Sequence, residues 1–288
     1  MSDNLENNMK RVFFTLILSC LFAVLAGCGN DQYAIEKQYW QAQKQAEKIF
    51  KNPHATPPRE LERVVKLLNR FIEKHPKTNL ALDAEFNIAR LYIVKEEYDK
   101  ARTQLRTILN KYAKSEAICS EAVFLIGNSY EIEDKWNLAL EQYKKIMQVY
   151  PITLRGLDIP IYIAQHYKVK YQPDKMVSAL EETIGHYRTL ASRYPKSPLS
   201  LKAHTLVAEC YIALKDWPNA ISSFNTVIDN YKDKVKMDGI LLDIAIIYNR
   251  ELKDKVKTKE TLEKLIKEYP KSQFVKTAQA LLKELEKK

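Results

Sequence analysis

A two-residue pattern recurs along the chain and limits what the chain can fold into. An aromatic residue, in most cases followed by proline, ends each segment of helical apolar periodicity. The pairs are His75-Pro76, Tyr112-Ala113, Tyr150-Pro151, Tyr194-Pro195, Tyr231-Lys232 and Tyr269-Pro270. Their second residues lie 37, 38, 44, 37 and 38 positions apart. A period of this length indicates one supersecondary unit repeated in tandem and stacked on its neighbours.

Each period contains two apolar stripes with helical spacing. In the unit after Pro76, residues 84–92 and 98–112 are predicted helices, and later units repeat the pattern. Proline disfavours helix in the residue before it, so each recurring pair is expected to end a second helix. Small residues stand where two antiparallel helices would cross, namely Ala89, Gly127, Ala101 and Ala139. The predicted fold class is all-α, an α-solenoid of helical hairpins.

Both ends of the chain depart from the repeat. Residues 31–50 form a predicted helix, and the proline-rich residues 52–58 interrupt the chain before helical periodicity resumes. After Pro270, one apolar stripe with polar residues around it predicts a C-terminal capping helix. The longest period is expected to contain a second helix, residues 175–193, about two turns longer than its counterparts. We therefore divide the chain into a signal segment (1–27), an N-terminal helix with a proline-rich linker (28–58) and the repeat array with its capping helix (59–288).

The N-terminal segment has the features of an export signal. Lys10 and Arg11 precede an apolar stretch, residues 12–25, that is too short to span a bilayer comfortably. Residues 25–28, Leu-Ala-Gly-Cys, resemble the lipobox of bacterial lipoproteins, which implies that Cys28 becomes the acylated first residue. An ordinary secretory signal with an unmodified Cys28 is the alternative. Residues 1–8 are polar, so translation from Met9 rather than Met1 is a second open point.

The residues after Cys28 bear on location. Two or three acyl chains on one cysteine would make membrane attachment effectively permanent. Gly29 and Asn30 follow, and in the proteobacterial lipoproteins that this segment resembles, an acidic residue there favours retention at the inner membrane. The resemblance therefore implies a lipid anchor on the periplasmic face of the outer membrane, with the inner membrane left open because sorting rules vary between lineages.

The repeats resemble tetratricopeptide repeats. The matching positions are small-x-x-Tyr, then aromatic-x-x-Ala, then an aromatic residue, as in Gly127 and Tyr130, Trp136 and Ala139, and Tyr143. The resemblance covers residues 60–288 and implies a scaffold that binds protein partners. Together with the lipobox, it extends to outer-membrane assembly lipoproteins of the BamD/YfiO type, which implies partners in β-barrel protein assembly. A Tol-Pal cell-division protein and an accessory scaffold for a cell-wall enzyme are the alternatives.

A partner groove, if present, is expected along the first helices of the hairpins. The candidate side chains face away from the paired helix: Phe86, Arg90, Ile93, Phe124, Asn128, Glu131, Glu209 and Ile212. In this interpretation the two phenylalanines are apolar anchors and Arg90 binds a carboxylate or a carbonyl. Packing between repeats explains the same residues equally well, and the sequence does not decide between the two.

No motif in the sequence predicts chemistry. The 5 histidines have no paired ligand spacing, and no nucleophile elbow or phosphate-binding loop is present. We therefore predict no enzyme activity, metal, cofactor or nucleic-acid partner. The net charge is +10, and residues 232–288 contain 15 basic and 10 acidic side chains. This basic end is either a solvated mixed-charge surface or a site for a polyanion. The oligomeric state is not specified.

Overall fold

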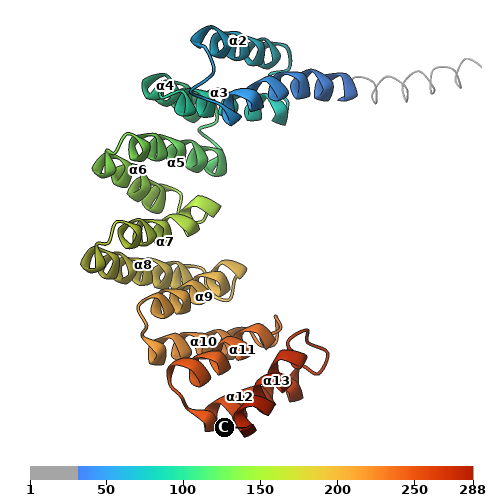
Figure 1. Cartoon of the computed structure of the whole chain (residues 1–288), viewed down its shortest axis with the longest axis vertical. Helices are drawn as coiled ribbons and strands as arrows, with labels where there is room; N and C mark the ends of the chain where they lie inside the picture. The colour runs from blue at the N-terminus through green and yellow to red at the C-terminus, as the bar shows by residue number, and fades with distance from the viewer. Residues whose placement is uncertain (1–31, 288) are drawn as a thin grey trace, which may run out of the picture. The chain divides into compact units, whose positions relative to one another are not determined.

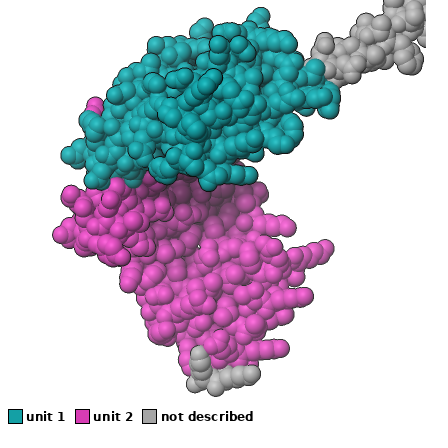
Figure 2. Space-filling model, turned by 45° about the horizontal axis from the view of Figure 1, so that its top comes forward, with its two compact units in different colours: residues 1–139 teal, residues 140–288 magenta. Residues whose placement is uncertain are grey.

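The computed structural model describes residues 32–287, and every regular element in that range is a helix. Figure 1 shows helices that follow one another as hairpins along the chain. Two compact units can be distinguished, residues up to 139 and residues from 140 onward, and Figure 2 colours them separately. Helix α6 (Trp136–Val149) crosses the boundary between them. The all-α hairpin architecture is confirmed.

In the first unit, α2 packs on α3, α3 on α4 and α4 on α5. The elements are helix 32–51, α2 (Pro58–Lys74), α3 (Asn79–Val94), α4 (Tyr98–Lys111), α5 (Glu116–Ile132) and the start of α6. Helix 32–51 buries Tyr39, Ala42, Ala46 and Ile49 in one core with α2 and α3. The boundary that we predicted at residue 58 therefore separates two helices of the same core.

The second unit continues the pattern after α6. Its elements are α7 (Leu154–Val169), α8 (Pro173–Arg193), α9 (Pro198–Ala213), α10 (Trp217–Tyr231), α11 (Asp238–Ile246), the π-helix η1 (Ile247–Glu251), α12 (Lys255–Glu268) and α13 (Val275–Lys287). The extra residues of the longest period lie in α8, which has 21 residues, as predicted. Helix α13 packs on α12 and buries Ala278 completely, as expected of a capping helix.

The predicted crossing positions are buried. Ala89, Ala101 and Ala139 have 0% of their surface exposed, and Gly127 is also buried. Small side chains let two helix backbones approach closely while larger neighbours fill the space around them. Large residues of second helices, such as Leu105 in α4, are fully buried beside these positions.

A serine or threonine two positions after a recurring proline connects successive hairpins. The Thr78 hydroxyl donates to the His75 carbonyl at 2.9 Å and accepts from the Ala81 amide at 3.1 Å. Thr153 and Ser197 make the same pair of hydrogen bonds in the second unit. Each side chain caps the first helix of the next hairpin and satisfies one of its unpaired amides. The recurring pair and the following hydroxyl residue therefore form one connector.

The turn inside each hairpin from α3–α4 to α11–α12 has a left-handed residue, and none of these residues is glycine. Glu96, Asp134, Tyr171, Lys215 and Lys253 all have φ between 54° and 61°. In the turn after α3, the Glu97 amide donates to the Tyr92 carbonyl at 2.8 Å and the Glu96 amide to the Ile93 carbonyl at 2.9 Å. This pair of hydrogen bonds is the Schellman motif, in which glycine is the favoured residue because a Cβ is strained there.

We predict that Lys215→Gly stabilises the protein. Removing the Cβ relieves the strain of the left-handed conformation, while glycine makes the unfolded chain more flexible and so opposes folding. The net gain in the free energy of unfolding should be about 1 kcal/mol. Urea unfolding followed by circular dichroism measures the change. Lys232→Gly is the matched control, because Lys232 follows α10 with φ −52° and has no such strain. Equal effects of the two substitutions would contradict the prediction.

Candidate partner-binding surface

Two of the predicted groove residues lie inside the protein. Phe86 and Ile93 project from α3, and each has 6% of its surface exposed. Phe86 packs in a core cluster with Leu105 and Ile108 of α4 and with Ala122 of the next hairpin. The structure therefore places the Phe86 ring in the packing between repeats, where no partner side chain can cover it.

Arg90 extends from α3 toward the first helix of the next hairpin. Its guanidinium lies 3.4 Å from the Glu121 carboxylate of α5 and 5.5 Å from the centre of the Phe86 ring. The Arg90 side chain is 37% exposed. We predicted that Arg90 binds a carboxylate or a carbonyl of a partner, and Glu121 of the same chain supplies that carboxylate. The exposed part of the Arg90 side chain still faces solvent.

The three candidates on α5 lie on one side of that helix. Phe124, Asn128 and Glu131 are spaced by four and then three residues, and all three are half-buried. Phe124 packs against the cluster that contains Phe86. Arg90 of α3 and the three α5 residues belong to the first unit and form a half-buried surface on adjacent first helices.

The two remaining candidates belong to the second unit. Glu209 of α9 is exposed, and Ile212 is half-buried against the core that α9 shares with α10 and α11. Both side chains are accessible to solvent, and a larger fraction of Glu209 is exposed than of Ile212.

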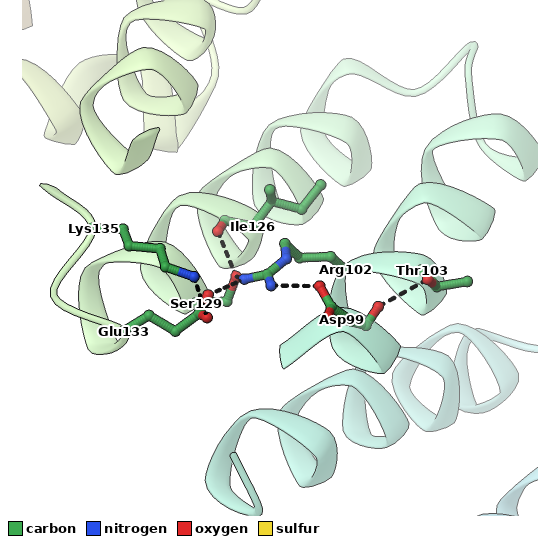
Figure 3. A network of polar contacts seen from close by, with 7 residues as sticks. All are labelled: Asp99, Arg102, Thr103, Ile126, Ser129, Glu133 and Lys135. Atoms are coloured by element: carbon green, nitrogen blue, oxygen red, sulfur yellow. Dashed lines mark hydrogen bonds and ion pairs between the residues drawn. The ribbon is translucent and has the colours of Figure 1, made fainter. Parts of the chain in front are cut away.

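A buried polar network, which we did not predict from sequence, joins two hairpins of the first unit. Arg102 of α4 is 5% exposed. Its guanidinium donates hydrogen bonds to the Glu133 carboxylate, to the Ser129 hydroxyl at 3.3 Å and to the Asp99 carboxylate at 2.7 Å (Figure 3). The guanidinium also lies 4.4 Å from the centre of the Tyr130 ring. One side chain of α4 thus holds the C-terminal turn of α5.

The charges of this network stabilise one another. Burial alone would lower the pKa of Arg102, but hydrogen bonds to Asp99 and Glu133 outweigh it and the pKa is raised. Burial likewise opposes ionisation of Glu133, yet Lys135 and Arg102 hold the pKa of that carboxyl below its ordinary value. Both groups are therefore ionised at neutral pH, and the network is a structural clamp between hairpins.

A surface cavity of about 290 Å³ lies beside the π-helix in the second unit. The Leu252 amide donates to the Ile247 carbonyl five residues back, at 3.1 Å, which widens the last turn before α12. Arg250, Lys253 and Lys255 line the cavity together with Leu281 and Leu285 of α13. The basic end of the chain therefore contains a defined hollow with three cationic side chains.

Within residues 32–287, no group of side chains could hold a metal ion. None of the helices in that range combines the length and the apolar character that a membrane span requires. Cys119 and Cys210 are buried free thiols, and burial raises the pKa of Cys210 to about 12. The lipidation site predicted at Cys28 lies outside the described residues.

Comparison with known proteins defines the class of repeat. The family model for the tetratricopeptide repeat matches residues 83–115, 204–234 and 240–272. These segments correspond to the hairpins α3–α4, α9–α10 and α11–α12. These three hairpins are therefore tetratricopeptide repeats. No curated protein sequence matches the chain.

Solved structures to which the chain is similar include three from different organisms. The TPR2AB domain of yeast Sti1, in a complex with pHSP90, is 15% identical over 87% of this chain and 99% of that chain, with a TM-score of 0.32. BtubC from P. vanneervenii is 12% identical over 81% and 90%, with a TM-score of 0.41. The human IFIT1 dimer with PPP-AAAA is 15% identical over 78% and 59%, with a TM-score of 0.38.

Proposed function

We propose that this protein is a non-catalytic scaffold that binds other proteins through its tetratricopeptide repeats. The observation that carries the proposal is the series of hairpins itself, which matches the repeat model in three segments. Stacked hairpins offer an extended surface, and the described residues supply no cluster of metal-ligating groups. The half-buried α5 side chains Phe124, Asn128 and Glu131 are the part of that surface that we expect to contact a partner.

The second part of the proposal is the location. A charged start, a short apolar stretch and Leu-Ala-Gly-Cys support acylation of Cys28, and Gly29 and Asn30 favour the outer membrane. The scaffold would then be anchored by lipid on the periplasmic face. In that setting the resemblance to BamD-type lipoproteins supports a role in β-barrel protein assembly. A Tol-Pal cell-division protein and a cell-wall enzyme accessory remain the alternatives.

Labelling with a palmitate analogue tests the anchor. In the native host, the wild-type chain should take up the label and Cys28→Ala should not, because the thioether needs the Cys28 sulfur. Sucrose-gradient fractionation of the labelled membranes then separates outer from inner membrane. Label that persists in Cys28→Ala would remove the anchor from the proposal.

Site-specific photo-crosslinking tests the partner. A photoreactive residue at Asn128 of α5 should capture β-barrel assembly components in envelopes, because that position is half-buried beside Phe124 and Glu131. Thr107, exposed on α4 of the neighbouring hairpin, is the matched control position and should capture nothing above background. Capture of Tol-Pal proteins at Asn128 would favour the alternative. Equal capture at both positions would contradict a partner surface on α5.

A further inference from the structure

One face of helix 32–51 is both aromatic and basic. Its residues recur every three or four positions, which places them on one side of an α-helix. They are Tyr33, Lys37, Trp40, Lys44, Lys48 and Lys51, and we call them the Tyr33–Lys51 stripe. All six are exposed, including the two aromatic side chains, which are 65% exposed at Tyr33 and 57% at Trp40.

The orientation of this stripe is fixed by the core. The opposite side of the helix buries Tyr39, Ala42, Ala46 and Ile49 against α2 and α3, so the stripe cannot turn inward without breaking that packing. The Tyr39 hydroxyl also donates to Asp83 of α3 and accepts from the Asn87 amide at 2.8 Å. The helix is thus held to the first unit with its tryptophan directed at solvent.

The chemistry of the stripe suits an anionic membrane surface. Tryptophan and tyrosine are enriched at the headgroup level of bilayers, where an apolar ring and a polar edge are both satisfied. Lysines close to anionic headgroups are attracted to them. Here both aromatic residues lie in the first half of the stripe with a lysine after each, and the Lys44 ammonium lies 4.9 Å from the centre of the Trp40 ring. Glu36 and Glu47 flank the stripe, but four lysines leave the face positive.

The position of the helix in the chain identifies the membrane as the occupant. Cys28 precedes the first described residue, Gln32, by four positions. Four residues span at most roughly 14 Å even when fully extended. An anchor on Cys28 would therefore hold Gln32, the residue just before the stripe, within about that distance of the headgroups.

We propose that the Tyr33–Lys51 stripe lies on the anionic headgroup layer and orients the first unit on the membrane. The inference depends on the proposed acylation of Cys28, which brings the helix to the surface. A lipid chain alone tethers the protein without fixing its orientation. The stripe adds a second contact, so the α2–α5 hairpins present a constant side to the periplasm.

The contact can be measured at Trp40 in the full chain, purified as the host processes it and reconstituted into vesicles. Subtracting the fluorescence of Trp40→Phe from that of the wild type isolates Trp40 emission, and an exposed Trp40 makes the substitution safe for folding. In vesicles that contain phosphatidylglycerol, Trp40 emission should shift to the blue and be quenched by brominated lipid. In phosphatidylcholine vesicles both effects should be weaker.

Charge substitutions sharpen the test. Lys37→Gln and Lys44→Gln should each lower the ratio of membrane-bound to water-exposed Trp40 about fivefold, the effect expected of one lysine near an anionic surface. Lys77→Gln and Lys114→Gln remove exposed lysines from the loops after α2 and α4 and should leave the ratio unchanged. An equal loss from both pairs would indicate general charge attraction and overturn the assigned face.

Failure of the stripe and failure of the anchor give different results. If wild-type chains float with the vesicles while Trp40 stays unquenched and open to iodide, the stripe does not contact lipid, and the proposal is overturned although the anchor holds. If Trp40 is quenched while Cys28→Ala still takes up the acyl label, the anchor at Cys28 is wrong and the surface contact stands. Protection of Trp40 from iodide only after envelope proteins are added would assign the stripe to a protein and overturn the lipid occupant.

Discussion

Arg102→Ala will destabilise the first unit by about 3 kcal/mol. The substitution removes a buried cation that bonds to Glu133 and Ser129 across two hairpins and stacks on Tyr130. Breaking a buried ion pair from one side costs roughly 3–5 kcal/mol, because the remaining charge stays buried without its partner. We expect the lower end, because the Glu133 side chain is 15% exposed and retains Lys135 at 2.8 Å. Guanidinium unfolding followed by circular dichroism measures the loss.

Two controls separate the clamp from simple loss of charge. Arg106→Ala removes the same side chain one turn later on α4, where it is exposed, and should change stability by less than about 0.5 kcal/mol. Asp99→Asn removes the charge of a side chain that is 99% exposed, and it should destabilise the protein far less than Arg102→Ala because solvent screens this ion pair. If Arg102→Ala costs no more than Arg106→Ala, the network does not hold the hairpins together.

The helical framework could be predicted because its determinants are local. Proline and aromatic residues end the second helices, and small residues mark the crossings, so a single sequence contains both signals. The greater length of α8 could be predicted because its period has seven more residues than the shortest periods, which corresponds to about two helical turns. The hydroxyl caps were also accessible, since Thr78, Thr153 and Ser197 stand at the same place after a recurring pair. We predicted that the recurring pair ends a helix but did not predict the cap that the hydroxyl forms.

The candidate surface was less predictable because it depends on how successive hairpins meet. Phe86 was expected to face away from its paired helix, but it packs with Leu105 and Ile108 of that helix and with Ala122 of the next hairpin, which together bury the ring. Arg102 follows the buried crossing residue Ala101 by one position. An arginine next to a buried position was the one sign in the sequence that pointed to the network. Its partners lie 27 and 31 residues later, so spacing alone could not reveal them. The π-helix has no local signal that we can identify.

Glycine to alanine will have opposite effects at two positions of the second unit. A Cβ added to Gly156, in the first turn of α7, would lie 2.1 Å from the Tyr150 carbonyl oxygen and 2.7 Å from the Pro151 backbone. Backbone atoms cannot move aside like a flexible side chain, so we expect a net loss of about 2 kcal/mol for Gly156→Ala. A Cβ added to Gly185, in α8, meets no atom within 4 Å. Gly185→Ala should gain about 1 kcal/mol from helix propensity alone.

The comparison tests whether the connector before α7 is rigid. Ala81 and Ser200 stand at the same position after their hydroxyl caps, and both have a Cβ that is buried without conflict. The Thr153 connector therefore closes more tightly than its counterparts, and glycine at position 156 makes room for it. Parallel urea titrations of Gly156→Ala and Gly185→Ala measure their free energies of unfolding. These should differ by about 3 kcal/mol if the connector keeps its shape. Stabilisation by both substitutions would show that the connector relaxes to the geometry of the other two.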